Sequence, residues 1–281
     1  MKHLRPETET PEPRQKKTHF YILLKMDKVI NLGIPHVGEK IFRSINTDGL
    51  IQCLAVSQSW KVMVENVLLK RWNGNLREAC RSGKTEIVRI LLESGLETGL
   101  NKIVKHGRTL LQLPCLNGHK EVAKLLIDHG ADVNAKGACW DYAINCACIG
   151  EHTDIVKLIL DYAPFKRIEF NKKDIGGRNA ILWSCEVGNT DIVKVLLDYS
   201  DTTNPIDWNI RNDVGRTAFM LACGNGRKDI VNLILDHSDS KNIDLDARDD
   251  DGRTAFELAS IRIPYSRYEQ TQIIELLELR L

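Results

Sequence analysis

Apolar residues recur in pairs along this chain at a nearly constant interval. The leading pair of each copy begins at residue 87, 122, 155, 192 or 230, so neighbouring copies are separated by 35, 33, 37 and 38 residues. A second apolar pair begins four residues after each leading pair, and a compact residue followed by cysteine begins eight residues before it. An interval of this size predicts stacked supersecondary units rather than one closed globular domain. Arrays of this kind typically bind other proteins.

Residues 213–223 give the clearest copy of the unit and predict a tight turn followed by a helix. Gly215 can adopt the positive φ of such a turn, and Thr217 can cap the helix by accepting a hydrogen bond from a free backbone N–H. The next apolar positions are spaced i, i+3 and i+4 and therefore share one helix face: Phe219, Ala222 and Cys223. We expect Gly226 to end this helix and Asp229 to begin a second one, whose buried face carries the two apolar pairs. Each unit is thus predicted to be turn, helix, turn, helix.

Five segments share a more detailed pattern. The match is close in residues 107–111, 215–219 and 252–256, looser in residues 177–181, and degenerate in residues 140–144. With Gly118-His119 and residues 130–134, they make the unit resemble the ankyrin repeat, whose usual pattern is G-x-T-P-L-H-x-A-x-x-x-G-H-x-x-I-V-x-x-L-L. The resemblance implies an all-α solenoid of about six helix-turn-helix units that binds proteins. The expected units are approximately residues 74–104, 105–137, 138–173, 174–211, 212–248 and 249–281.

The copies depart from the ankyrin pattern in ways that bear on stability. Its proline is replaced by leucine or alanine, and its histidine is replaced at five positions: Gln112, Asn145, Leu182, Met220 and Glu257. In the family, the threonine and histidine of the pattern help to lock adjacent turns by hydrogen bonds, so we expect a less rigid stack. The last unit is expected to carry an insertion, residues 261–272, and to stop inside its outer helix.

Three loops between units are longer than usual and alternate apolar and polar residues: 168–171, 206–209 and 243–246. This alternation suggests extended fingers. Phe170 and Trp208 occupy the position of Val133, and we expect them to pack within their loops. The polar residues at the finger tips are candidates for binding a target protein: Lys172, Lys173, Arg211, Asn212, Asp213, Arg248, Asp249, Asp250 and Asp251.

Residues 29–73 do not follow the repeat and predict three short helices. The first would follow Pro35, the second would be capped by Thr47 or Asp48, and the third would run towards Trp72. About forty residues bury too little apolar surface for a secure core of their own. Residues 1–28 have the composition of a disordered tail.

The pattern Ile34-Pro35, Ile41-Phe42, Ile45, Leu50, Cys53, Val56-Ser57 and Trp60 resembles an F-box. The resemblance implies docking on the small Skp-type linker subunit of a cullin-based ubiquitin ligase. It also supplies the candidate contacts, which are Ile34, Pro35, Val37, Ile41, Leu50, Val56 and Trp60. The alternative is a helical cap on the repeat stack with no ligase connection.

The overall charge narrows the choice of partners. The 281 residues carry 39 basic and 38 acidic side chains, a formal balance of +1, which gives no reason to expect nucleic acid or an anionic membrane as the main partner. We find neither a secretory signal nor a membrane-spanning stretch, and therefore expect a cytosolic or nuclear protein.

The eight cysteines invite a zinc or disulfide interpretation. Five of them share one position of the repeat, where a cysteine fills a tight helix seam as a small hydrophobe, and no C-x-x-C pair occurs. No catalytic constellation, metal site or cofactor motif is discernible. We therefore expect a non-catalytic adaptor, the substrate-recognition subunit of a cullin-based ubiquitin ligase. The alternative is a plain ankyrin scaffold or inhibitor.

Overall fold

Helices and turns make up the described part of this chain. The computed structural model describes residues 42–54, 58–72, 75–95, 99–104, 106–138, 142–162, 167–199, 205–261 and 267–280. Within these ranges there is no β-strand, so the all-α prediction is confirmed and the finger loops contain turns rather than extended strands. The chain divides into two compact units, residues 1–74 and 75–281.

The first unit contains α3 (Thr47–Cys53) and α4 (Gln58–Trp72), which pack against each other. Asn46 caps α3, because its side chain accepts a hydrogen bond from the N–H of Gly49 at 2.8 Å. The expected caps, Thr47 and Asp48, were wrong: both lie inside the helix, whereas Asn46 has the extended backbone that a cap requires. The expected first helix lies almost entirely outside the described residues.

The described residues of the second unit form six helix pairs, and each consists of a short inner helix followed by an outer helix. They are α5 (Leu76–Arg81) with α6 (Thr85–Glu93), α7 (Gln112–Asn117) with α8 (Lys120–Asp128), α9 (Ala143–Ile149) with α10 (Thr153–Asp161), α11 (Ala180–Val187) with α12 (Thr190–Asp198), α13 (Ala218–Gly224) with α14 (Lys228–Lys241), and α15 (Ala255–Ser260) with α16 (Arg267–Arg280). We number these pairs as repeats 1 to 6. Inner helices pack on inner helices and outer helices on outer helices, which gives two layers.

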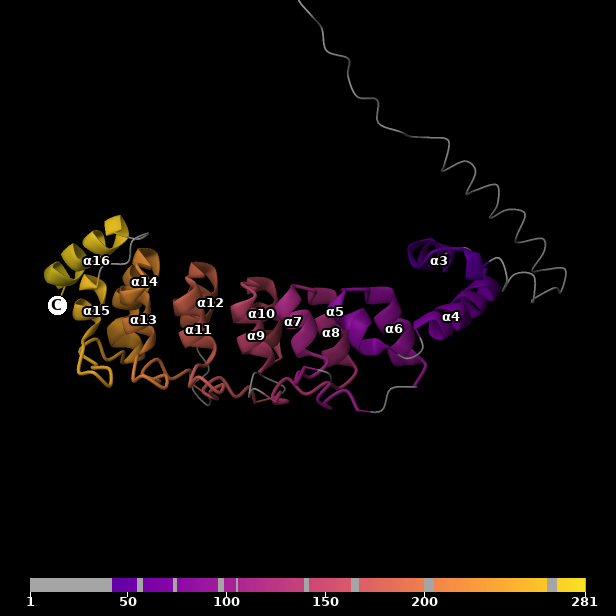
Figure 1. The fold of residues 1–281 in the computed structure, drawn as a ribbon, viewed down its shortest axis with the longest axis horizontal. Coiled ribbons are helices and arrows are strands. Elements are labelled where there is room, and N and C mark those ends of the chain that lie inside the picture. Colours follow the sequence, from indigo (N-terminus) through magenta and orange to yellow (C-terminus); the bar gives the residue numbers. More distant parts are fainter. Residues whose placement is uncertain are drawn as a thin grey trace, which may run out of the picture. The chain divides into compact units, whose positions relative to one another are not determined.

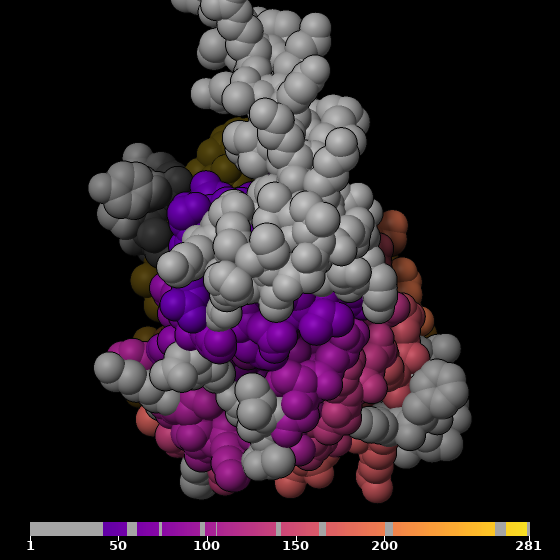
Figure 2. All heavy atoms as spheres, turned by 90° about the vertical axis from the view of Figure 1, so that its right-hand side faces the viewer, coloured from indigo at the N-terminus to yellow at the C-terminus, as the bar shows by residue number. Residues whose placement is uncertain are grey.

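The described parts of the loops that join one pair to the next lie along a single edge of this unit (Figure 1). In the end-on view, atoms of successive repeats follow one behind another, from magenta to orange (Figure 2). Because the main contacts of each described repeat are with its neighbours, the stack is held together pair by pair.

The apolar pairs of the sequence pattern form the core between the layers. Ile192, Val193 and Leu196 of α12 have no exposed surface, and the matching residues of α6, α8, α10 and α14 are buried as well. Full burial of an aliphatic side chain contributes about 1.5–3 kcal/mol relative to leaving it exposed. The repeated spacing is therefore the main source of stability.

The cysteine that recurs in repeats 1 to 5 is buried, as the sequence predicted. The five side chains have no exposed surface and are not bonded to another sulfur: Cys80, Cys115, Cys148, Cys185 and Cys223. Burial disfavours the thiolate and raises the pKa of Cys148 to about 12. These thiols are small packing groups.

The turn chemistry of repeat 5 follows the prediction with small shifts. Gly215 has φ +76°, and the Thr217 hydroxyl accepts a hydrogen bond from the N–H of Met220 at 3.4 Å. The inner helix ends at Gly224 rather than Gly226, and the outer helix begins at Lys228, one residue before the predicted Asp229.

The last repeat differs from the expectation. Helix α16 begins at Arg267, so the latter part of the predicted insertion 261–272 is already helical. Its residues Ile273 and Leu277 are 0% and 1% exposed, so they complete the helix pair. Gln270 secures the start of α16, because its side-chain N–H groups donate to the carbonyls of Ile261 at 2.9 Å and Gly224 at 3.4 Å.

Candidate protein-binding face

A ladder of asparagines joins the finger loops. In three successive repeats the asparagine Oδ1 accepts from a backbone N–H of the next loop, while Nδ2 donates to a carbonyl of that loop. Asn134 bonds the N–H of Glu169 at 3.0 Å and the carbonyl of Arg167 at 2.6 Å. Asn171 bonds the N–H of Asp207 at 2.9 Å and the carbonyl of Pro205 at 3.1 Å. Asn209 bonds the N–H of Asp244 and the carbonyl of Asn242, both at 2.8 Å.

Phe170 and Trp208 are each 2% exposed, like Val133 at 3%, so their predicted packing within the loops is confirmed.

Each finger tip in repeats 4 to 6 is shaped by one short polar side chain. Asp174, Asn212 and Asp249 occupy the same position, and each Oδ1 accepts hydrogen bonds from backbone N–H groups two and four residues further on, at 2.8–3.1 Å. These side chains replace the backbone partners that a turn would otherwise lack. Two of the candidate target-binding residues, Asn212 and Asp249, therefore build the turns.

The other tip candidates lie on the surface. Four have exposed side chains: Lys172, Asp213, Asp250 and Asp251. The three remaining basic residues are also exposed, but each donates to a finger carbonyl. Lys173 donates to Arg211 at 2.7 Å, Arg211 donates to Gly215 at 2.8 Å, and Arg248 donates to Gly252 at 2.8 Å. The fingers thus present a fixed row of cations beside acidic side chains.

Asp249 has the most restricted carboxylate of the set. Its side chain is 0% exposed, and it forms ion pairs with Arg216 at 3.3 Å and Arg253 at 3.0 Å. Burial by itself would raise the pKa of this carboxyl. The backbone N–H of Arg253 and the two guanidinium groups outweigh that effect, and the pKa of Asp249 is lowered.

The sequence analysis missed a cluster around Trp183. The Arg178 guanidinium lies 3.8 Å from the centre of the Trp183 ring and 3.2 Å from the Glu186 carboxylate. The indole N–H of Trp183 donates to Asp174 at 2.8 Å. The available signal was positional, because Trp183 stands at the variable residue between histidine and alanine of the ankyrin pattern.

Trp183 belongs to a row of inner-helix positions that face away from the outer layer. These positions lie four and seven residues after the threonine position of the ankyrin pattern, and we call those of repeats 2 to 5 the open strip: Leu113, Leu116, Cys146, Ile149, Trp183, Glu186, Leu221 and Gly224. Leu116, Ile149 and Trp183 are half-buried, so part of each side chain is open to solvent. The accessible surface of the strip is therefore mainly apolar.

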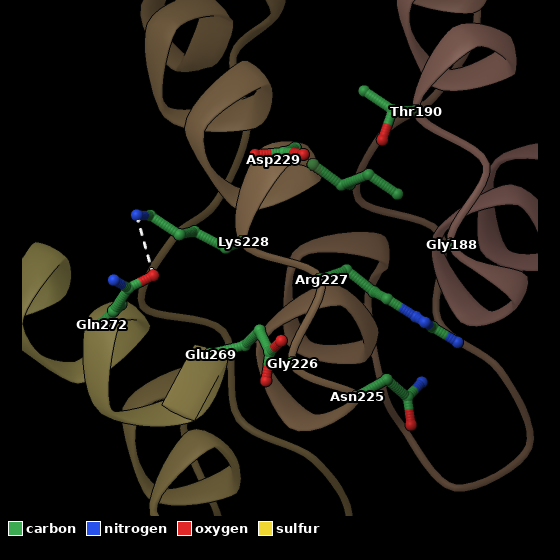
Figure 3. A pocket seen from close by; sticks show the side chains of 10 residues that line it. Gly188, Thr190, Asn225, Gly226, Arg227, Lys228, Asp229, Glu269 and Gln272 are labelled. Atoms are coloured by element: carbon green, nitrogen blue, oxygen red, sulfur yellow. Dashed lines mark hydrogen bonds between the residues drawn. The ribbon is translucent and has the colours of Figure 1, made fainter. Parts of the chain in front are cut away.

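A pocket of about 530 Å³ lies at the other end of the helices, among the short turns of repeats 4 to 6 (Figure 3). Its cations already have partners. Arg227 donates to the carbonyl of Glu186 at 3.4 Å, and Lys228 donates to Gln272 at 2.9 Å. With Asp229 and Glu269 beside them, the lining has no excess of either charge that would select a ligand.

Most of the predicted linker contacts fall outside the described residues, namely Ile34, Pro35, Val37, Ile41 and Val56. Trp60 lies in the first turn of α4. Leu50 is 0% exposed in the structure, so it can contact a partner only if the packing around it opens.

Two histidines in the described ranges join neighbouring repeats. The side chains of His119 and His152 bond the carbonyls of Arg81 and Leu116 in the preceding repeat, at 3.1 Å and 3.2 Å. Within the described ranges, His, Cys, Asp and Glu side chains do not gather in threes close enough to hold a metal ion. None of the described helices has both the length and the apolar character needed to cross a bilayer.

Known proteins share sequence and structural similarity with this chain. A family model described as "Ankyrin repeats (3 copies)" matches residues 52–137, 138–207 and 202–277. The human Notch-regulated ankyrin repeat-containing protein is 31% identical over 91 residues, covering 32% of this chain and 80% of that protein. A protein from Oryza sativa subsp. japonica, "Probable E3 ubiquitin-protein ligase XBOS32", is 36% identical over 98 residues, covering 33% of this chain and 18% of that protein.

A solved structure, "Crystal Structure of EF0377 an Ankyrin Repeat Protein", superposes with a TM-score of 0.62 at 29% identity. The superposition covers 74% of this chain and 98% of that one. With the matched family model extending over most of the sequence, the chain belongs to the ankyrin-repeat family.

Proposed function

We propose that this protein is a non-catalytic adaptor that joins a target protein to a cullin-based ubiquitin ligase. The repeat unit is an ankyrin protein-interaction scaffold. In the proposal, its fingers and open strip hold the target, while the segment before the repeats docks on a Skp-type linker subunit. The recruited enzymes perform the chemistry, and this chain supplies proximity in the cytoplasm or nucleus.

The observation that carries the proposal is the separation of the chain into two compact units with different sequence patterns. The F-box-like residues lie in the first unit, and the repeats make up the second. A two-part adaptor needs this division, because one surface must remain free for the target while the other holds the ligase. One ankyrin relative is itself named a probable E3 ubiquitin-protein ligase, which agrees with such a role.

A second candidate function is a scaffold or inhibitor without a ligase. It is favoured by the ankyrin family match, which begins at residue 52 and so overlaps α3 and α4. In this alternative α3 and α4 serve as a helical cap, and the F-box-like residues only pack the first unit.

Capture of a purified Skp-type linker subunit by the full chain separates the two candidates. We expect the intact chain to bind, and Trp60→Ala to weaken binding about thirtyfold, because loss of a central aromatic contact typically costs about 2 kcal/mol. Val62→Ala is the matched control, since Val62 lies in the same helix with 55% of its surface exposed and is not part of the motif.

Circular dichroism would establish that each variant is folded. If a folded intact chain fails to capture the linker, the adaptor role is wrong and the scaffold remains. Equal losses from both substitutions would also contradict docking through the motif.

A further inference from the structure

Four arginines occupy the same repeat position, immediately before the threonine of the ankyrin pattern or the asparagine that replaces it: Arg108, Arg178, Arg216 and Arg253. Three of them are paired with carboxylates. Arg178 lies 3.2 Å from Glu186, while Arg216 and Arg253 lie 3.3 Å and 3.0 Å from Asp249. Arg108 differs, because within the described residues its side chain has neither a hydrogen-bond nor an ion-pair partner, and its Nε is buried.

The finger of repeat 2 explains the difference. Val104 stands at the position that Asp174, Asn212 and Asp249 occupy in later fingers. The loop still closes through the backbone, since the Val104 N–H donates to the Arg108 carbonyl at 2.7 Å. This finger therefore lacks the acid that engages Arg178 or Arg253. A half-buried guanidinium with unused donors is unfavourable until a carboxylate satisfies them.

Arg178 indicates where a side chain from this position can reach. Its guanidinium covers Trp183 and meets Glu186, which are both in the open strip. In repeat 2 the equivalent strip residues are Leu113 and Leu116, with Ile149 next along the stack. The unpaired cation therefore borders an apolar surface that continues to Trp183.

We infer that Arg108 and the open strip together bind an unfolded or extended segment of the target that carries one acidic side chain followed by bulky apolar side chains. The inference rests on the target-binding half of the proposed function and adds the chemistry of the target. The carboxylate pairs with Arg108, and the apolar side chains lie over Leu116, Ile149 and Trp183. A polyanion is disfavoured, because Asp174, Glu186 and Asp249 lie among the arginines of the same face.

The repeat geometry fixes the spacing within such a segment. Packed helices lie about 8–10 Å apart, so Arg108 and Trp183, two repeats apart, are separated by roughly 20 Å. An extended chain advances about 3.3 Å per residue, which corresponds to about six residues between the acidic and the bulky apolar side chain.

Selection from a phage-displayed library of random twelve-residue peptides on the immobilised full chain tests this inference. We expect enrichment of Asp or Glu placed about six residues from Trp, Phe or Leu. Arg108→Gln is expected to weaken a synthetic enriched peptide by about tenfold to hundredfold and to remove the preference for an acid. Trp183→Ala is expected to remove the preference for the apolar residue.

Two matched variants keep the test independent of folding defects. Val104→Asp supplies the missing tip carboxylate, and we expect it to weaken the peptide by competing for Arg108 while the chain becomes more stable to urea. Arg216→Gln removes an arginine that is already paired, and we expect it to leave peptide affinity unchanged.

Several results would overturn the inference: enrichment of basic or purely apolar peptides, no enrichment at all, or equal peptide affinity of wild type, Arg108→Gln and Val104→Asp. Capture of the linker subunit does not enter this experiment. If linker capture fails and peptide selection succeeds, the ligase role is rejected and the binding strip is supported. If linker capture succeeds and peptide selection fails, the binding strip is rejected and the ligase role is supported.

Discussion

Repeats 3 and 5 share one apolar frame and differ in their polar and turn positions. In repeat 5 the Thr217 side chain caps the inner helix, Met220 is buried three residues later, and Gly226 provides a positive φ of +70°. In repeat 3 the equivalent cap position makes no side-chain hydrogen bond, and both polar atoms of the buried Asn145 lack partners among the described residues. Glu151 is held at φ +61°, where glycine is normal.

The comparison separates two roles of the sequence pattern. The apolar pairs are buried in both repeats except for Leu160 of repeat 3, which is half-buried, so the pairs determine that the helices stack. The turn and cap residues determine how stable each repeat is by itself. Because stability in a stack is a sum of unit and nearest-neighbour contributions, repeat 3 is a weak link within the stack.

The largest expected effect comes from breaking the apolar frame of repeat 5. Phe219 is 0% exposed, and we expect Phe219→Ala to lower the free energy of unfolding by about 3–5 kcal/mol through the cavity it leaves. Phe256 occupies the same position in repeat 6 but is 37% exposed, so Phe256→Ala should cost much less. Urea unfolding of both variants measures the difference, and equal losses would contradict the role given to neighbour packing.

The next effect should come from repairing repeat 3. Leucine fits the position of Asn145, because Leu182 occupies it in repeat 4 at 1% exposure. We expect Asn145→Leu to raise the free energy of unfolding by about 1–3 kcal/mol by removing two unsatisfied polar atoms. Leu182→Asn is the reverse control and should lower it. A loss of stability in Asn145→Leu would show that Asn145 has a partner in solution.

A smaller, pH-dependent effect is expected at the tip of repeat 6. Folding lowers the pKa of Asp249 below its ordinary value of 3.8. The ion pairs therefore stabilise the fold fully above pH 3.8, and this stabilisation is lost as the pH falls through the pKa of the folded state. Asp249→Asn keeps the turn, as Asn212 does in repeat 5, and should remove about 1–2 kcal/mol at pH 7.

The difference between Asp249→Asn and wild type should shrink as the pH is lowered below 4, as measured by urea unfolding at several pH values. The exposed Asp213 serves as control, since Asp213→Asn should leave the pH profile unchanged. A pH-independent loss at Asp249 would mean that its charge is not what stabilises the tip.

The smallest effect should come from relieving the backbone of repeat 3. Gly118 and Gly188 have positive φ at the position of Glu151, so we expect Glu151→Gly to raise stability by up to about 1 kcal/mol. For a unit of this size, that corresponds to an increase of about 2–4 °C in Tm. Gly188→Ala should lower Tm, and an unchanged Tm in Glu151→Gly would show that the strain is absorbed elsewhere.

The fold was largely predictable because its cause is periodic. The spacing of the apolar pairs and cysteines identified both layers, and Thr217 was correctly assigned as a cap. The cap of α3 was assigned one or two residues too late, because adjacent Asn46, Thr47 and Asp48 are all chemically able to cap and only the backbone distinguishes them. The early start of α16 was missed because Gln270 stabilises it through contacts with residues far along the chain.

The candidate site was only partly predictable. Polarity identified the finger tips, but it could not separate exposed acids such as Asp250 from Asp249, whose carboxylate is enclosed by arginines from two repeats. Trp183 escaped notice because an aromatic residue within an apolar helix suggests core packing. Its half-buried position depends on which side of the inner layer lacks a covering layer, and only its place in the ankyrin pattern, not the apolar spacing of its own helix, indicates that side.

The buried sulfur atoms have a practical consequence. Repeats 1 to 5 each carry one cysteine at the same sealed position, and a thiol reagent can reach it only after that repeat separates from its neighbour. Each of these cysteines therefore reports, through its reaction with the reagent, the transient opening of its own repeat in the native chain. Mass spectrometry of the alkylated peptides would yield an opening rate for every cysteine separately, and Cys148 of repeat 3 should be modified first.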